Sequence, residues 1–126
     1  MNGTLADEQA ACISPGDHGF LVGDGVFETL RCYGGVPFAL EDHLGRLEEG
    51  ARALGLEPPA RESLRDGARA VLAANGLADA RMRITFTSGT GPPGLARRGP
   101  EGGHSRDVVQ PGRTQKRSVA SQSPAR

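Results

Sequence analysis

Two adjacent glycines constrain this chain more than any other feature. Gly34 and Gly35 separate the run VFETLRCY, residues 26–33, from the run VPFAL, residues 36–40. β-Branched and aromatic residues favour a strand before the glycines, and a two-residue glycine turn predicts a hairpin because the tight turn types require positive φ. Pro37 cannot donate a hydrogen bond to a ladder, so its amide side should face away from a partner strand.

Alternation along the first strand divides its side chains between two faces. One face carries Phe27, Thr29, Arg31 and Tyr33, and the other carries Glu28, Leu30 and Cys32. Neither face is purely apolar. The pattern fits an edge strand with one solvated side, and it also fits a face that borders a cavity. The glycine-rich approach, with Gly at 16, 19, 23 and 25, allows positive φ at several points, and its apolar run, residues 20–22, predicts a short buried strand.

The segment after the hairpin has the apolar period of a helix that lies on a sheet. Its apolar residues recur at spacings of four and three: Leu40, Leu44, Leu47, Ala51 and Leu54. Gly55 should end this helix, with Leu56 placed for the hydrophobic contact of a Schellman cap. Arg46 lies one turn before Gly50, which has no side chain to crowd it. This arginine is either a cation beside a groove or a member of a surface ion pair with Asp42, Glu49 or another neighbouring acid.

The chain then predicts a second helix over residues 61–74 and a third strand after it. Asn75 and Gly76 should stop the helix, and Met82, Ile84 and Phe86 alternate with polar residues. The expected fold is α+β: a small antiparallel or mixed sheet with two helices on one face. The loop SGTGPPG, residues 88–94, lacks the Lys-Ser/Thr pair and helix of a phosphate-binding P-loop.

Composition changes at Leu95. Residues 95–126 contain no aromatic residue and are rich in Gly, Pro, Ser and Arg, so we expect a disordered basic tail after a small domain, residues 1–94. Residues 1–88 hold 8 basic and 13 acidic side chains, whereas residues 89–126 hold 7 and 2. A basic tail without aromatic stacking partners is a poor nucleic-acid site.

Cysteine and histidine usage predicts neither a disulfide framework nor a metal site. The chain has two cysteines, Cys12 and Cys32, and its three histidines show no metal-ligand spacing. The sequence shows no signal peptide and no membrane span. We therefore expect a cytoplasmic protein without structural zinc and without a membrane partner.

The composite pattern resembles a known family. GDGVFETLR, a glycine turn, PFAL, and HLGRL at the start of an alanine-bearing helix that ends in LGL are similar to the amino-terminal domain of class IV (fold type IV) pyridoxal-phosphate enzymes. The family includes branched-chain and D-amino-acid aminotransferases and aminodeoxychorismate lyase, and the resemblance covers roughly residues 13–94. It implies transamination or lyase chemistry on an amino-acid-like substrate, pyridoxal 5′-phosphate as cofactor, and a homodimer.

The resemblance also implies roles for individual residues. Arg46, the arginine of HLGRL, inherits the role of binding the cofactor phosphate, which suits a guanidinium fork. Phe27 lies toward the substrate in relatives, and Thr29 and Arg31 share its strand face as further pocket candidates. In several relatives an arginine near the position of Ser88 helps to hold a substrate carboxylate, and its absence here weakens the case for their specificity.

The lysine that forms the Schiff base in relatives has no counterpart in this sequence. The single lysine, Lys116, lies in QKRS, which does not resemble the family's lysine motif. No catalytic residue is therefore assigned, and we expect a truncated or frame-shifted member that keeps a phosphate half-site. The alternative is a non-catalytic interaction domain derived from the family, which would bind a partner through the sheet surface that a second domain normally covers.

Overall fold

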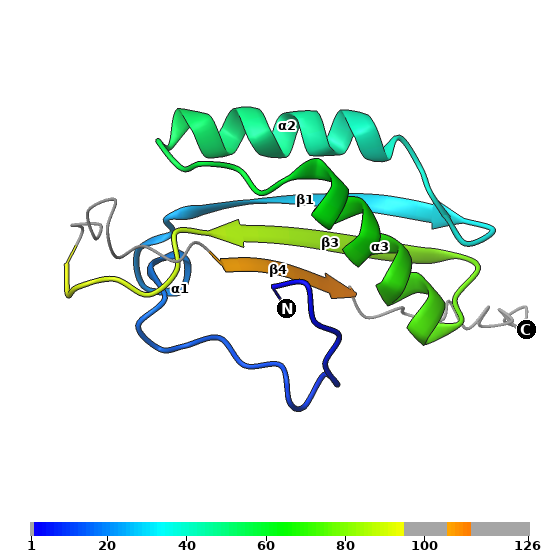
Figure 1. Ribbon diagram of the computed structural model, residues 1–126, viewed down its shortest axis with the longest axis horizontal. Coiled ribbons are helices and arrows are strands. Elements are labelled where there is room, and N and C mark those ends of the chain that lie inside the picture. The colour runs from blue at the N-terminus through cyan, green and yellow to red at the C-terminus, as the bar shows by residue number, and fades with distance from the viewer. Residues whose placement is uncertain (1, 95–105, 112–126) are drawn as a thin grey trace, which may run out of the picture.

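The fold is a four-stranded antiparallel sheet with two helices on one face, which confirms the expected α+β class (Figure 1). The computed structural model describes residues 2–94 and 106–111. The strands lie in the order β2-β1-β3-β4. Their bounds are β1 Gly25–Tyr33, β2 Val36–Pro37, β3 Ala80–Thr87 and β4 Arg106–Pro111. The helices are α1 His18–Val22, α2 Leu40–Ala53 and α3 Arg61–Asn75.

The predicted hairpin is present. Gly34 and Gly35 have φ of 57° and 77°, and Tyr33 lies opposite Val36 in the β1–β2 register. The return strand β2 ends at Pro37 and is shorter than the expected run of residues 36–40. The chain then turns into α2, which begins at Leu40. β1 therefore has a strand neighbour on its β2 side only at its carboxyl end.

Alternation in β1 and β3 builds the core on the helix side of the sheet. The residues buried there come from all four major elements: Leu30, Cys32, Leu44, Leu47, Leu64, Ala68, Leu72, Ala80, Met82 and Ile84. The apolar period predicted for α2 is thus confirmed from Leu40 to Ala51, whereas Leu54 at the end of the helix is 37% exposed. The end of α2 is a Schellman cap, since the N–H of Leu56 donates to the carbonyl of Ala51 at 2.8 Å and Gly55 has φ of 70°.

The expected buried strand at residues 20–22 is wrong. These residues belong to helix α1, and Phe20 is 73% exposed. Local capping explains the difference, because the Asp17 carboxylate accepts from the N–H of Gly19 at 2.8 Å and Gly23, with φ of 70°, ends the helix. Of the four glycines in this approach, only Gly23 adopts positive φ.

Part of the segment that composition sets apart belongs to the sheet. Residues 106–111 form β4, which pairs antiparallel with β3 so that Val108 lies opposite Thr85 and Val109 opposite Ile84. Pairing along the second edge of β3 satisfies backbone donors and acceptors, a gain that composition does not reveal. Residues 95–105 and 112–126, and with them the rest of the expected tail, lie outside the described residues.

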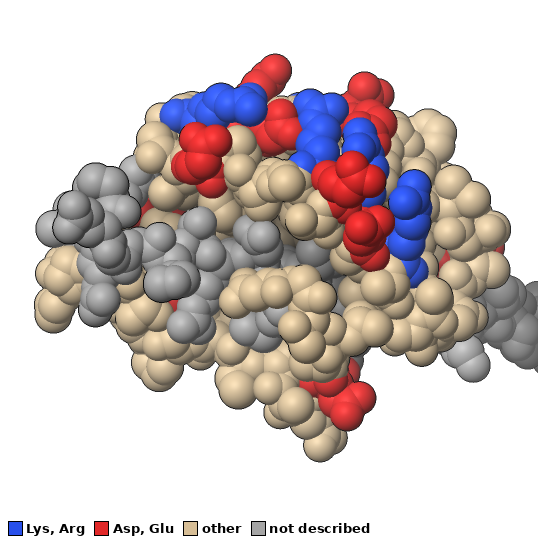
Figure 2. All heavy atoms as spheres, viewed as in Figure 1, with Lys and Arg blue, Asp and Glu red and all other residues tan. Residues whose placement is uncertain are grey.

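Charged side chains tie the two long helices together on their solvent side. Figure 2 shows basic and acidic groups side by side over α2 and α3. Arg61 donates to Glu48 at 2.5 and 3.1 Å, and Arg65 donates to Glu41 at 2.7 Å through two nitrogens. Exposed pairs of this kind contribute little individually, so the apolar core carries most of the stability. No helix among the described residues is both long and apolar enough to cross a bilayer.

Leu44 tests this assignment of the core. Its side chain is 0% exposed between α2 and the sheet, so Leu44→Ala should lower the free energy of unfolding by about 2–5 kcal/mol in urea titrations. Leu54→Ala is the matched control, since Leu54 at the end of the same helix is 37% exposed and should lose far less. Equal losses would contradict the assignment.

Candidate functional site

Arg46 meets a carboxylate of β1 where α2 packs on the sheet. Its Nε and Nη2 atoms donate to Glu28 Oε1 and Oε2 at 3.3 and 3.1 Å. His43, one turn earlier on α2, places Nδ1 2.5 Å from Glu28 Oε2. Two α2 residues spaced by three thus converge on one strand residue, because such residues share a helix face.

The contacts of His43 define where its proton lies. Nδ1 is 2.5 Å from the Glu28 carboxylate and 2.8 Å from Arg46 Nη2. A guanidinium only donates, so Nδ1 needs a free lone pair to accept from Arg46 but a proton to donate to Glu28, and it cannot have both. The contact with the carboxylate is shorter and charge-assisted, which favours a protonated Nδ1 that donates to Glu28.

Glu28 remains ionised in this cluster. Its side chain is only 16% exposed, and this burial by itself raises its pKa. Hydrogen bonds from Arg46 and His43, together with their positive charge, outweigh burial and hold the pKa of Glu28 below its ordinary value. The carboxylate therefore neutralises one side of the arginine fork and fixes the orientation of its plane.

Arg46 keeps one free edge for a ligand. Its side chain is 56% exposed, and Nη1 has no hydrogen-bond partner among the described residues.

Of the two interpretations of the sequence, the ion pair is present, but its partner is Glu28 rather than Asp42 or Glu49. The sequence did not reveal Glu28 as the partner because it lies 18 positions before Arg46. Strand alternation had nevertheless placed Glu28 on the face of β1 opposite to that of Phe27.

The other candidate residues lie on the opposite face of β1. Phe27 and Tyr33 are 56% and 53% exposed, and Thr29 and Arg31 alternate with the buried Leu30 between them. The guanidinium carbon of Arg83 on β3 lies 3.8 Å from the centroid of the Phe27 ring. The structure thus groups these candidates with each other and separates them from Arg46 by the sheet.

An unpaired strand edge connects the two faces. β2 pairs with β1 only at Cys32 and Tyr33. Residues 26–30 of β1 therefore have no strand partner on that side among the described residues.

A second, fully buried polar cluster fixes the loop after β3. Asp17 and His18 are each 1% exposed. Thr87 donates to the Asp17 carboxylate at 3.0 Å and accepts from the N–H of Gly89 at 3.2 Å. His18 Nε2 lies 2.8 Å from the carbonyl oxygen of Pro92. This cluster anchors residues 88–92, the loop rejected as a P-loop, against α1.

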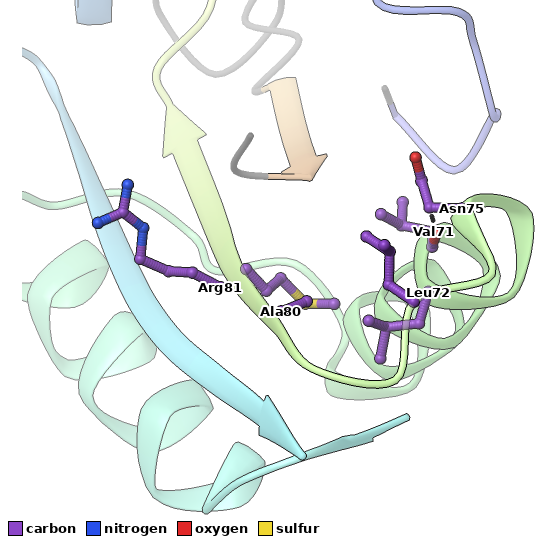
Figure 3. Close-up of a pocket in the computed structure, with 7 residues that line it drawn as sticks. Val71, Leu72, Asn75, Ala80 and Arg81 are labelled. Atoms are coloured by element: carbon purple, nitrogen blue, oxygen red, sulfur yellow. Dashed lines mark hydrogen bonds between the residues drawn. The ribbon is translucent and has the colours of Figure 1, made fainter. Parts of the chain in front are cut away.

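A small cavity beside α3 is unrelated to these residues. It lies between the carboxyl end of α3 and β3, and Figure 3 shows Val71 and Leu72 on its wall. Its volume is about 10 Å³, room for about one water molecule and far below the roughly 300–1,000 Å³ typical of ligand pockets. The Arg81 side chain points away from α3. We therefore assign no ligand to this cavity.

Comparison with known proteins identifies the family. The amino-transferase class IV family matches residues 25–120, so the chain belongs to it. This range includes most of the segment that composition sets apart. Aminodeoxychorismate lyase of Bacillus subtilis is 38% identical over 98 residues, which are 75% of this chain and 33% of that protein. The chain spans about a third of the length of the relatives that it matches.

Solved structures share the fold. The 4-amino-4-deoxychorismate lyase of Pseudomonas aeruginosa superposes with a TM-score of 0.72 and 36% identity, covering 88% of this chain and 38% of that one. The PLP-bound form of a hypothetical aminotransferase from Mycobacterium tuberculosis gives a TM-score of 0.66 and 25% identity, with coverage of 84% and 36%. Both cover little more than a third of the solved chain.

Glu28→Gln should make the free energy of unfolding less dependent on pH in the acidic range. Because the pKa of Glu28 is lowered in the folded chain, the ionised carboxylate stabilises the fold at pH values above its ordinary pKa of 4.5. This stabilisation is lost as the pH falls through the lowered folded-state pKa. The variant should be less stable than wild type at pH 7 by about 1 kcal/mol, with a smaller difference at pH 3, in urea titrations. The control is Glu57→Gln, at an exposed position. A deficit that persists unchanged at pH 3 would contradict this role.

Thr87→Val tests how much the Thr87 hydroxyl contributes to the stability of the buried polar cluster. The change keeps the shape of the side chain but leaves the Asp17 carboxylate, 1% exposed, without the donor at Oδ2. We expect a loss of about 1–3 kcal/mol in unfolding free energy. Thr85→Val, on the open face of the same strand, should change stability by less than about 0.5 kcal/mol. Similar losses in both variants would show that the Asp17 contact is unimportant.

Proposed function

We propose that this chain is the amino-terminal part of a pyridoxal-phosphate-dependent aminotransferase or aminodeoxychorismate lyase that acts on an amino-acid-like substrate. The full protein would be a homodimer, as the family resemblance implies, and it would be cytoplasmic, in keeping with its two free cysteines. The observation that carries the proposal is the Arg46 guanidinium, oriented by Glu28 and 56% exposed. The comparisons do not favour the alternative of a non-catalytic interaction domain.

Arg46 suits the phosphate of the cofactor. A phosphate dianion accepts hydrogen bonds from a planar guanidinium more specifically than from an ammonium. Glu28 occupies the Nε side of the fork, which leaves Nη1 to donate to phosphate oxygen. His43, which donates to the same carboxylate, limits how strongly Glu28 neutralises the arginine. When bound, pyridoxal phosphate supplies the aldehyde that reacts with amines and the ring that accepts electrons.

Phe27, Thr29 and Arg31 are proposed to face the substrate. They share the exposed face of β1, and the unpaired edge at residues 26–30 lies between that face and Arg46. Arg46 would hold the phosphate of the cofactor, and Phe27, which is 56% exposed, is available for contact with the substrate.

The amine that this chemistry needs lies outside the small domain. Residues 1–94 contain no lysine, and Lys116, the single lysine of the chain, lies outside the described residues. The proposed role of the domain is therefore to bind and orient the cofactor phosphate. The catalytic amine would come from residues beyond this chain, so we expect this chain alone to bind without catalysing transamination.

Arg46→Gln tests the phosphate site directly. Pyridoxamine 5′-phosphate is the probe, because it carries the phosphate but no aldehyde that could modify amines. In titrations of ¹⁵N-labelled chain, Arg46→Gln should weaken binding about tenfold, since it removes a charge-assisted hydrogen bond. Arg46→Lys should fall between the two, because an ammonium keeps the charge without the fork.

Arg69→Gln is the matched control, since Arg69 is an exposed α3 arginine paired with Asp66. It should bind like wild type. Pyridoxamine, which lacks phosphate, should bind no better to wild type than to Arg46→Gln. Equal binding of pyridoxamine phosphate by wild type and Arg46→Gln would overturn the assignment.

A further inference from the structure

His43 and Arg46 share one oxygen of Glu28. His43 Nδ1 lies 2.5 Å from Glu28 Oε2, and Arg46 Nη2 donates to the same oxygen at 3.1 Å. The second oxygen, Oε1, accepts from Arg46 Nε at 3.3 Å. The carboxylate is thus divided between two donors, so a change in one donor alters what the carboxylate offers to the other.

The second ring nitrogen of His43 is open to protonation. Nδ1 carries the proton that Glu28 accepts, so the lone pair of the neutral imidazole lies on Nε2. No described residue forms a hydrogen bond with Nε2, and the side chain is 16% exposed. Histidine changes charge between about pH 5 and 8. A proton taken up from solvent would therefore settle on Nε2 without breaking the bond to Glu28.

The sheet presents two ionisable side chains to this part of α2, Glu28 and Cys32. Burial alone would raise the pKa of Glu28, but hydrogen bonds from Arg46 and His43 hold it below its ordinary value, so the carboxylate stays ionised. Burial raises the pKa of the Cys32 thiol, which stays neutral. The β3 side chains in this core are apolar. Histidine is therefore the group of this cluster that changes charge near neutral pH.

The helices contribute the remaining charges. The pKa of Arg46 is raised mainly by its hydrogen bond to the β1 carboxylate, and less by the charges of Asp42 and Glu49 on α2. The α3 arginines pair with Glu41 and Glu48, which lie on the opposite flank of α2 at about 100° per residue. With a neutral imidazole, the carboxylate of β1 thus directly opposes the charge of Arg46.

We propose that protonation of His43 strengthens the binding of an oxyanion at Arg46, so that the site holds phosphate more tightly in mild acid than in mild alkali. The imidazolium adds one positive charge and draws the shared oxygen of Glu28 towards Nδ1, because charge-assisted hydrogen bonds are the stronger ones. His43 is a positioning residue, which acts on the ligand through Glu28 and Arg46. That the oxyanion belongs to the cofactor rests on the proposed function, whereas the pH dependence rests on this cluster alone.

Sulfate is the probe for this inference. It stays a dianion in this pH range, whereas a phosphate monoester takes up a proton near about pH 6. The ¹⁵N-labelled chain is titrated with sulfate at constant ionic strength, and the side-chain Nε–H resonance of Arg46 is followed. We expect binding about fivefold tighter at about pH 5.5 than at about pH 8, the effect of one added charge near a partly exposed site.

Two variants isolate the imidazole. His43→Gln keeps an N–H that can donate to Glu28 but cannot change charge, so its affinities at the two pH values should agree within about twofold. His43→Lys is charged at both pH values and should bind sulfate tightly at both. Tight binding by His43→Lys also requires a folded site, so unfolding cannot imitate the expected result.

Glu49→Gln is the matched control. It removes one exposed negative charge that acts on Arg46, and it leaves the imidazole in place. The variant should therefore raise the affinity for sulfate by a similar factor at both pH values and keep the difference between them. The inference is overturned if wild type binds sulfate equally at both pH values, or if His43→Gln keeps the full pH dependence. Sulfate-induced shifts that persist in Arg46→Gln would also overturn it, because the anion would then lie elsewhere.

Pyridoxamine phosphate in the same spectra tests the proposed function separately. If it fails to bind while sulfate binds with the expected pH dependence, the proposed function falls and this inference stands. If it binds at Arg46 while the affinity for sulfate is independent of pH, this inference falls and the proposed function stands. If neither anion binds at Arg46, both are overturned.

Discussion

The period-two alternation of β1 and β3 is the constraint on which the rest of the structure depends. With β1 and β3 paired in register, Leu30, Met82 and Ile84 must all face the same side, and two helices with matching apolar faces cover them. The opposite side then receives Phe27 and the arginines of both strands. One geometric rule therefore decides both where the core lies and which polar groups stay accessible to a ligand.

Charge follows the same division. On the helix side, cations meet carboxylates, and Glu28 belongs to that side because it alternates with Phe27. Its lowered pKa keeps it ionised beside Arg46, so the arginine is oriented before any anion arrives. On the open side, Arg31, Arg81 and Arg83 form no ion pair within residues 2–94. The Arg46 guanidinium is thus oriented by an internal counter-charge, whereas the sheet arginines are not.

Most elements of the fold were predictable because each rests on local signals. The paired glycines define the hairpin, apolar spacing defines α2 and α3, and Gly55 and Gly76 take the left-handed conformation that ends these helices. Prediction failed at α1, where a side-chain cap outweighs an apolar run, and at β4, where strand pairing orders a segment poor in apolar residues. At β4 the deciding hydrogen bonds join residues far apart in the sequence, whereas at α1 they include a local cap from Asp17 to Gly19, which an interpretation based on the apolar run alone overlooks.

The sequence by itself determined the periodicity, the turn chemistry and the composite motif, because these depend on residue type and spacing along the chain. It therefore indicated the α+β class, the family and the candidate residues. Only the tertiary structure decided which partners those residues meet: Glu28 for Arg46, Asp17 for Thr87, and Arg81 opposite Arg31. The physical reason is that charge interactions depend on distance in space, and strand register and helix packing bring together residues that are 18 to 70 positions apart.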